Sequence, residues 1–181
     1  MAEEKVQTGI YDAGMVDEQA VLDLVKLVND AYGRHRWLFP EERTNVTEFR
    51  REAAGKELVL LLSGPDEKIV GSALVHEEGD ALYLEMVAVE LLRQGVGLGA
   101  RLMQAVEEIA RQRSLSKIRL STVREIGNVA YYLRHGFHIV QEQSLPRGTW
   151  GALDSFTLAT MEKEAVRTNN DFSLPSPAMS S

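Results

Sequence analysis

The chain has 181 residues, 44% hydrophobic and 26% charged, and a net charge of −7, a balance typical of one globular domain. It has no cysteine, which excludes disulfides, thiolate metal sites and a cysteine nucleophile. The acidic balance without a basic stripe argues against a nucleic-acid partner. No apolar run is long enough to cross a membrane and no secretory signal is evident, so we expect a cytoplasmic protein with no membrane partner.

Alternation of apolar and polar residues, or short apolar runs bounded by turn residues, marks the expected strands. These are expected at residues 6–11, 58–62, 69–77, 81–89, 118–123, 137–141 and 156–161. The four histidines show no spacing typical of metal ligands, so we expect no metal site. They are His35, His76, His135 and His138.

Four helices are expected between these strands. The first runs from an Asp17 cap to about Tyr32, with Gly33 as its C′ residue. The others cover residues 46–54, a stretch that begins near Leu98, and residues 128–135. The resulting order, β-α-α-β-β-β-α-β-α-β-β, indicates a mixed α/β sheet with an antiparallel meander rather than repeated βαβ units. We expect one domain over residues 1–164 and a flexible tail over 165–181, which is rich in Ser, Pro and Asn.

The stretch RQGVGLGARL, residues 93–102, places three alternating glycines before the third helix. One interpretation is the dinucleotide fingerprint G-x-G-x-x-A, starting at Gly95. That fingerprint requires its first glycine almost directly after a strand, whereas the preceding strand ends near Val89. No Gly-Lys-Ser/Thr follows, so the loop is not a Walker A loop either.

The other interpretation needs no βαβ context. Free backbone N–H groups at a helix N-terminus bind pyrophosphate through hydrogen bonds and the helix dipole. Glycines let the backbone approach the ligand closely and adopt unusual dihedral angles. Because the glycines here lead into a strongly amphipathic helix, the loop is predicted to bind pyrophosphate.

The stretch around this loop resembles motif A of the GNAT superfamily of acyl-CoA-dependent N-acyltransferases, Q/R-x-x-G-x-G/A, through Gln94, Gly97 and Gly99. About thirty residues later, NVAYYLRHGF resembles the second landmark of the same family. The matching residues there are Asn128, Tyr132, Gly136 and Phe137. The resemblance covers about residues 5–163. It implies the GNAT fold, a central mixed sheet of six to seven strands flanked by about four helices.

The resemblance also implies an activity, the transfer of an acetyl group from acetyl-CoA to a primary amine of a small molecule. The transfer would be direct, within a ternary complex, and would need no metal. A homodimer is compatible with the family. The alternatives are a peptide or protein amine as acceptor, or a non-catalytic module that binds and senses acyl-CoA.

By resemblance, the backbone of two segments would hold the co-substrate. Pantetheine would pair with the strand segment made of Met86, Val87, Ala88 and Val89. The N–H group of Val87 would also polarise the thioester carbonyl. The pyrophosphate would meet the loop residues Gln94, Gly95, Val96, Gly97, Leu98, Gly99 and Ala100.

Tyr132 is the candidate general acid, since a phenol is protonated at neutral pH and can donate to a departing thiolate. The offset from Gly136 favours it over its neighbour Tyr131. Asn128 would contact the cofactor arm, cap its helix, or do both.

Glu85 is the candidate base, in the apolar run LYLEMVAV, where strand alternation places it on one face with Tyr83, Val87 and Val89. A carboxylate desolvated by such neighbours would be a stronger base. His76 and a chain of waters are the alternatives.

The acceptor site would be built from two loops, RHRWLFPEERT and SLPRGTWGALD. Trp37, Phe39 and Trp150 offer apolar walls. Carboxylates that could receive a cationic amine are those of Glu41, Glu42 and Asp154. Arg36 and Arg147 would suit an acceptor that carries a carboxylate.

Overall fold

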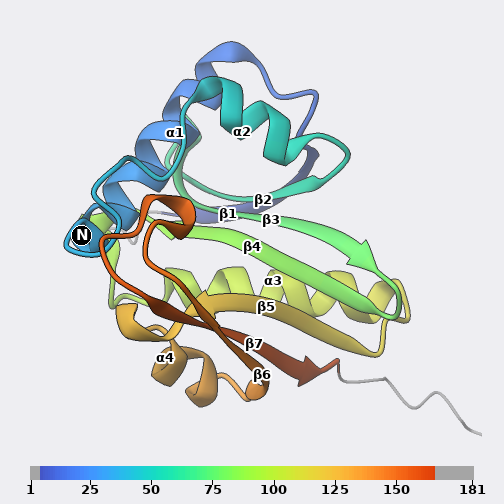
Figure 1. Ribbon diagram of the computed structural model, residues 1–181. Helices are drawn as coiled ribbons and strands as arrows, with labels where there is room; N and C mark the ends of the chain where they lie inside the picture. Colours follow the sequence, from blue (N-terminus) through green and yellow to red (C-terminus); the bar gives the residue numbers. More distant parts are fainter. Residues whose placement is uncertain (1–4, 166–181) are drawn as a thin grey trace, which may run out of the picture.

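The computed structural model describes residues 5–165, which form one seven-stranded sheet with the strand order β1-β2-β3-β4-β5-β7-β6 (Figure 1). All neighbouring strands are antiparallel except β4 and β5, which are parallel. The strands are β1 (Val6–Asp12), β2 (Glu57–Ser63), β3 (Lys68–Glu78), β4 (Ala81–Val89), β5 (Lys117–Val123), β6 (His138–Leu145) and β7 (Phe156–Glu164). The expected α/β class with a mixed sheet is confirmed.

Four α-helices cover the two faces of this sheet: α1 (Glu18–Tyr32), α2 (Val46–Ala53), α3 (Leu98–Gln112) and α4 (Val129–Arg134). Helices α1 and α2 lie on one face, with α3 and α4 on the other (Figure 1). Each face has its own apolar core, one centred on Leu102 and Val106 of α3 and the other on Leu24 and Val28 of α1. No helix in residues 5–165 is long and apolar enough to cross a membrane.

The starts of α1 and α2 follow from their capping residues. The Asp17 carboxylate accepts a hydrogen bond from the Ala20 amide at 2.8 Å, and Asn45 does the same for the Glu48 amide at 3.0 Å. Both bonds satisfy amides that a helix leaves free in its first turn. The prediction of Gly33 as the C′ residue is wrong: Gly33 is the C-cap residue of α1, with a right-handed φ of −58°, and the chain continues into a 3-10 turn, Gly33–His35.

The last two strands are longer than their apolar patterns predict. Ala165, which falls in the predicted tail, is buried, and its amide donates a hydrogen bond to the Ser116 carbonyl. The remainder of the predicted tail, residues 166–181, lies outside the described residues.

Strand β4 contains a β-bulge at its centre. Leu74 of β3 pairs with Glu85, but Ser72, two residues away, pairs with Ala88, so β4 has one extra residue here. Met86 has a φ of 51°, a left-handed conformation that is uncommon for residues other than glycine. Beyond the bulge the alternation of side chains inverts: Leu82 and Leu84 face the α3 core, whereas Met86 and Ala88 face the α1 core.

Strands β4 and β5 separate directly before the bulge. They pair only between Ala81–Leu84 and Lys117–Leu120. From Glu85 to Val89, therefore, β4 has one edge that no other strand pairs with, and β5 continues beside β7 alone. The fold thus leaves an open backbone edge in the middle of the sheet, between the helices of its two faces.

Leucines Leu24 and Leu22, both on α1, provide a matched test of this packing. Leu24 is completely buried against the sheet, and Leu22 is 47% exposed. Leu24→Ala is expected to lower the free energy of unfolding by about 2–5 kcal/mol. Leu22→Ala should change it by no more than about 0.5 kcal/mol. Urea unfolding of both variants checks this; equal losses would contradict the assignment of the buried face.

Candidate active site

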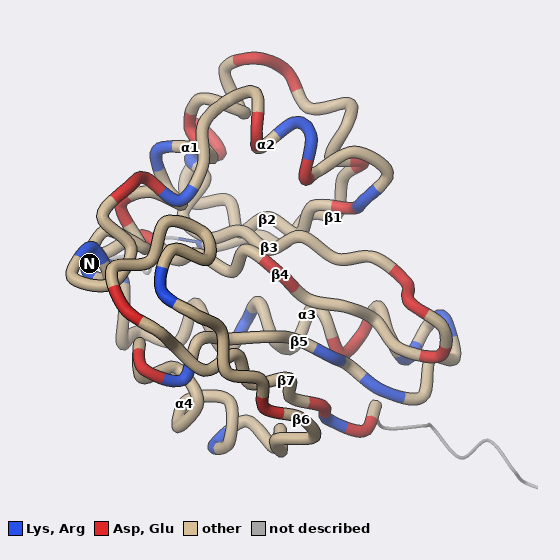
Figure 2. The backbone as a smooth tube through the Cα atoms, in the orientation of Figure 1, with Lys and Arg blue, Asp and Glu red and all other residues tan. Residues whose placement is uncertain are grey.

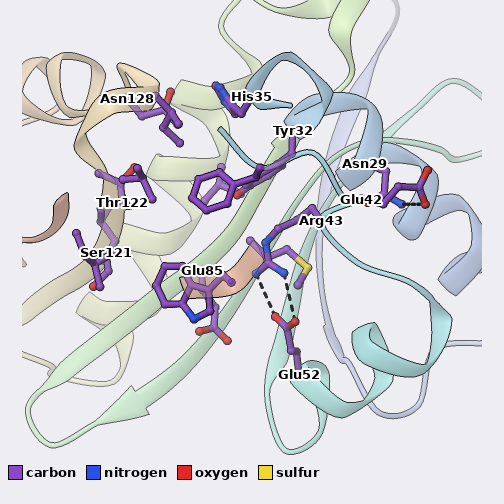
Figure 3. A pocket seen from close by; sticks show the side chains of 18 of the residues that line it. Asn29, Tyr32, His35, Glu42, Arg43, Glu52, Glu85, Ser121, Thr122 and Asn128 are labelled. Carbon is purple, nitrogen blue, oxygen red and sulfur yellow. Dashed lines mark hydrogen bonds and ion pairs between the residues drawn. The ribbon is translucent and has the colours of Figure 1, made fainter. Parts of the chain in front are cut away.

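A cavity of about 630 Å³ lies where β4 and β5 separate. Its floor comes from Glu85, Met86 and Val87 of β4 and from the end of β5. Helices α1 and α2 and the segment between them supply further lining residues, and so do Asn128 and Tyr132. Figure 3 shows Asn128 and Arg43 on different sides of the pocket. The volume is within the range of small-ligand sites.

The glycine loop lies beside this cavity and ends in a left-handed Gly97, with φ of 90°, directly before α3. Six consecutive N–H groups, from Gly95 to Ala100, donate no hydrogen bond to another described residue. The Gln94 amide differs, because it donates to the Leu91 carbonyl at 3.4 Å. These six N–H groups lie at the N-terminus of a 15-residue helix, where they could donate hydrogen bonds to the oxygens of a pyrophosphate.

The Gln94 side chain and Gly99 have roles in shaping this loop. The Gln94 amide group donates to the Val89 carbonyl at 3.4 Å and accepts from Arg34 at 3.2 Å, which ties the loop to the end of β4. At Gly99, an added Cβ would lie 2.6 Å from the Tyr131 hydroxyl oxygen. Any larger residue here would therefore require the Tyr131 side chain to move.

Tyr132 is only 8% exposed, and its ring packs edge-on against Phe137 and Tyr131. Its hydroxyl makes no hydrogen bond to another described residue. Burial raises the pKa of Tyr132, and the nearby Tyr32 adds to the effect. A protonated phenol facing a cavity can act as a proton donor.

Asn128 lines the cavity but does not cap α4 with its side chain. Its φ and ψ are already helical, −78° and −15°, and no capping hydrogen bond forms. The expected capping role is therefore wrong, and the side chain is left available to a ligand.

Glu85 lies on the cavity floor and forms an ion pair with Lys56, the residue before β2. Because of the bulge, Glu85 shares a face with Tyr83 but not with Val87 and Val89, which pack toward the α3 core. The predicted grouping of these four residues on one face is therefore wrong. The Glu85 carboxylate is 27% exposed, so it contacts both its ion-pair partner and the cavity.

His76 does not line this cavity. Its ring lies 5.3 Å from that of Tyr83, and its buried Nδ1 has no hydrogen-bond partner among the described residues. The nearest carboxylate, that of Glu78, is 3.8 Å from Nε2. The histidine is therefore placed away from the acceptor side of the cavity.

A group of pocket residues in the first two helices and their connection is not predicted from the sequence. Arg43 forms a two-point ion pair with Glu52, at 3.2 Å for each bond. Its guanidinium lies 5.9 Å from the centre of the Tyr32 ring, a cation–π distance. In the sequence, Tyr32 is only the last residue of an amphipathic helix. Arg43 and Glu52 are nine residues apart, a spacing that does not match the period of a helix or a strand.

Two of the three predicted acceptor-site aromatics line the cavity, Phe39 and Trp150, and Trp37 does not. Trp150 has a φ of 52°, between two left-handed glycines, and its ring lies 5.4 Å from that of Phe156. Such strained backbone is often found at ligand sites. Of the predicted carboxylates, Glu41 and Glu42 line the cavity, and Asp154 instead accepts from the Ser155 amide.

The loops that carry these aromatics meet across the gap between β4 and β5. The Leu153 amide donates to the Leu38 carbonyl at 2.8 Å. Below this bond, Leu38, Val123 and Phe156 form a separate buried cluster. Figure 1 shows the β6–β7 connection lying against the segment after α1. These two loops therefore form one side of the cavity.

Comparison with known proteins gives the family. The model of the acetyltransferase (GNAT) family matches residues 22–137. The chain belongs to this family. It is therefore an acyl-CoA-dependent N-acetyltransferase, and the family uses acetyl-CoA as co-substrate. In the part of the chain that the structure describes, no three potential metal ligands gather at one point.

Solved structures of this GNAT fold resemble the chain over nearly its whole length. The ribosomal-protein-S18-alanine N-acetyltransferase from Escherichia coli has a TM-score of 0.67 at 13% identity, covering 91% of this chain and 98% of its own. A GNAT acetyltransferase from Elizabethkingia anophelis with acetyl-CoA bound has a TM-score of 0.60 at 15% identity, covering 88% and 97%. No curated protein sequence matches significantly. At these identities the likeness shows the fold alone.

Gly97→Glu is expected to abolish CoA binding, because its carboxylate would lie beside the free N–H groups and repel the negatively charged pyrophosphate. Gly79→Glu is the matched control, since both glycines are left-handed and both have open space around the added Cβ. Gly79 lies in the β3–β4 turn. Calorimetric titration with CoA checks this; retained binding by Gly97→Glu, or loss in both variants, would contradict the loop assignment.

Proposed function

We propose that this acetyltransferase transfers the acetyl group of acetyl-CoA to a primary amine of a small molecule, directly and within a ternary complex. The observation that supports the acceptor class is that the two loops that meet at Leu38 and Leu153 limit the cavity on one side. A bounded cavity of about 630 Å³ favours a small acceptor over an extended peptide, which needs an open groove or sheet edge.

In this proposal, the free N–H groups from Gly95 to Ala100 hold the pyrophosphate of acetyl-CoA. The open edge of β4, from Met86 to Val89, pairs with the pantetheine arm, and Asn128 contacts that arm. The Val87 N–H polarises the thioester carbonyl. Fixed donors at the point where negative charge develops are among the largest contributions to catalysis.

The charges of the cavity favour a cationic acceptor. Its lining includes five glutamates, Glu41, Glu42, Glu48, Glu52 and Glu85, against three arginines, Arg36, Arg43 and Arg51. Figure 2 shows acidic residues on α2, on the segment that leads into it and on β4. Glu85, held by Lys56, is proposed to attract the ammonium form of the amine to the cavity. The ammonium then releases one proton to water, and the neutral nitrogen becomes a nucleophile.

Tyr132 is proposed to protonate the departing thiolate. Tyr132→Phe should lower kcat at least tenfold or so, because general acid catalysis contributes about 100- to 10,000-fold. CoA binding should be unchanged, since the ring that packs on Phe137 is retained. Steady-state thiol release from acetyl-CoA with the best amine checks this, and an unchanged kcat would contradict the role.

A panel of acceptors tests the proposal as a whole. Thiol release and mass-spectrometric detection of the product would be measured with small mono- and diamines, amino acids and peptides with free N-termini. Turnover of small amines with a kcat/KM well above that of every peptide is expected. A preference for peptides would contradict the acceptor class, and CoA binding without turnover of any amine would contradict acetyl transfer by this site.

A further inference from the structure

The residues that line the cavity divide into a charged part and an apolar part. All the charged side chains precede β5 in the sequence, and from β5 onward none of the described lining residues carries a charge. Figure 3 shows Arg43 and Glu52 on one side of the pocket and Thr122 of β5 on another. The apolar part, which we call the apolar wall, consists of Phe39, Val123, Ile126, Trp150 and Leu158.

The apolar wall is an extension of a buried cluster of the fold. Val123 belongs to the cluster around Phe156, and Phe39 packs against that cluster. The Phe39 ring lies 5.2 Å from the Phe156 ring at an angle of 74°, and the Trp150 ring lies 5.4 Å from it at 38°. Phe156 therefore supports two aromatic rings that both line the cavity, so this surface is backed by packed side chains.

Trp150 is the exposed end of this wall, and its backbone is unusual. Its side chain is 63% exposed and its φ is 52°, a left-handed conformation that is rare for a bulky residue. Neither the exposure nor the backbone conformation favours the folded state of the free protein. Conformations of this kind, when a structure retains them, are concentrated at ligand sites.

The turn around Trp150 fixes this conformation through its own hydrogen bonds. The Gly148 amide donates to the Ala152 carbonyl at 2.9 Å, and the Gly151 amide donates to the Gly148 carbonyl at 3.0 Å. The bond from Leu153 to the Leu38 carbonyl holds the end of the turn against the other loop. The indole is therefore presented to the cavity by an ordered turn, and a ligand that packs on it loses little entropy in arranging the protein.

We propose that Trp150 determines the specificity for the acceptor, and that the acceptor is a primary amine on an apolar body of about the size of a ring, which packs on the exposed part of the indole. This inference rests on the proposed function of the cavity and names the class of amine.

The chemistry of the wall favours such an acceptor over one with a second charge. A flat apolar body packed on the indole removes water from both surfaces, and pairs of aromatic rings are attractive beyond the area that they bury. The amino group of the acceptor would lie at the cavity floor, near Glu85 and Val87, where the proposed chemistry takes place. The second charge of a diamine or an amino acid would then meet a wall without a charged partner, which is unfavourable.

The two tryptophans of the chain provide a matched test. Trp37 is 59% exposed, almost as much as Trp150, but does not line the cavity. Trp150→Ala and Trp37→Ala would be compared by thiol release with 2-phenylethylamine and with ethylamine, which differ only by the phenyl ring. The thermal shift caused by CoA would report folding and co-substrate binding in each variant.

The wild type should have a kcat/KM for 2-phenylethylamine at least about tenfold above that for ethylamine, since the ring is buried only in the former. Trp150→Ala is expected to remove about tenfold of this preference, with the CoA shift and the turnover of ethylamine retained. Trp37→Ala should keep the preference. In Trp37→Phe, where Trp150 is the single tryptophan, 2-phenylethylamine added to the CoA complex should change the fluorescence, and ethylamine should not.

Several results would overturn this assignment while acetyl transfer to small amines still stands. They are an equal loss for both amines in Trp150→Ala, the same loss of preference in Trp37→Ala, or a wild type that prefers a diamine such as putrescine. Loss of the CoA shift in Trp150→Ala would also overturn it, since Trp150 would then belong to the co-substrate site. Absence of turnover by the wild type with every amine would instead overturn the proposed function, and this assignment with it.

Discussion

The site depends on the separation of β4 from β5 directly before the bulge at Met86. Backbone groups inside a sheet are normally all paired, and an unpaired edge is costly unless something covers it. Here the edge from Glu85 to Val89 opens between α1 on one face and α3 on the other. The bulge inverts the side chains of β4, so Met86 and Ala88 complete the α1 core while the free edge stays accessible. The cavity lies at this gap, and so do the proposed sites for the co-substrate and the acceptor.

Two carboxylates that line the cavity beside the gap are held in ion pairs. Lys56 pairs with Glu85, and Glu52 pairs with Arg43 on the face of the Tyr32 ring. Ion pairs of this kind hold the two carboxylates in fixed positions at the cavity. The hydroxyls of Tyr32 and Tyr132, which also line the cavity, have no hydrogen-bond partner among the described residues. The proposed mechanism uses this contrast: Tyr132 protonates the thiolate, and the carboxylates attract the amine.

Local patterns predict much of this molecule. Apolar periodicity predicts α1 and α3, alternation predicts β3 and β4, and the glycines and Gln94 predict the free N–H groups before α3. The bulge was not predictable, because Glu85 and Met86 fit an uninterrupted alternating pattern and only the pairing with β3 shows the extra residue. Lys56, Arg43 and Tyr32 have no local signature, since their roles arise from contacts between segments that are distant in sequence. Trp37 was predicted to line the acceptor site only because it is aromatic. In the fold it lies outside the cavity.

Amide hydrogen exchange with and without saturating CoA tests the central claim most directly, because it reports on the backbone groups themselves. Bound CoA should slow exchange at residues 86–89 and 95–100, where the structure leaves the β4 edge and the loop N–H groups without partners. The amides of β1 and β2, already paired with each other, should be unaffected. Unchanged exchange in both expected segments at saturating CoA would contradict the claim that the gap between β4 and β5 is where this acetyltransferase holds its co-substrate.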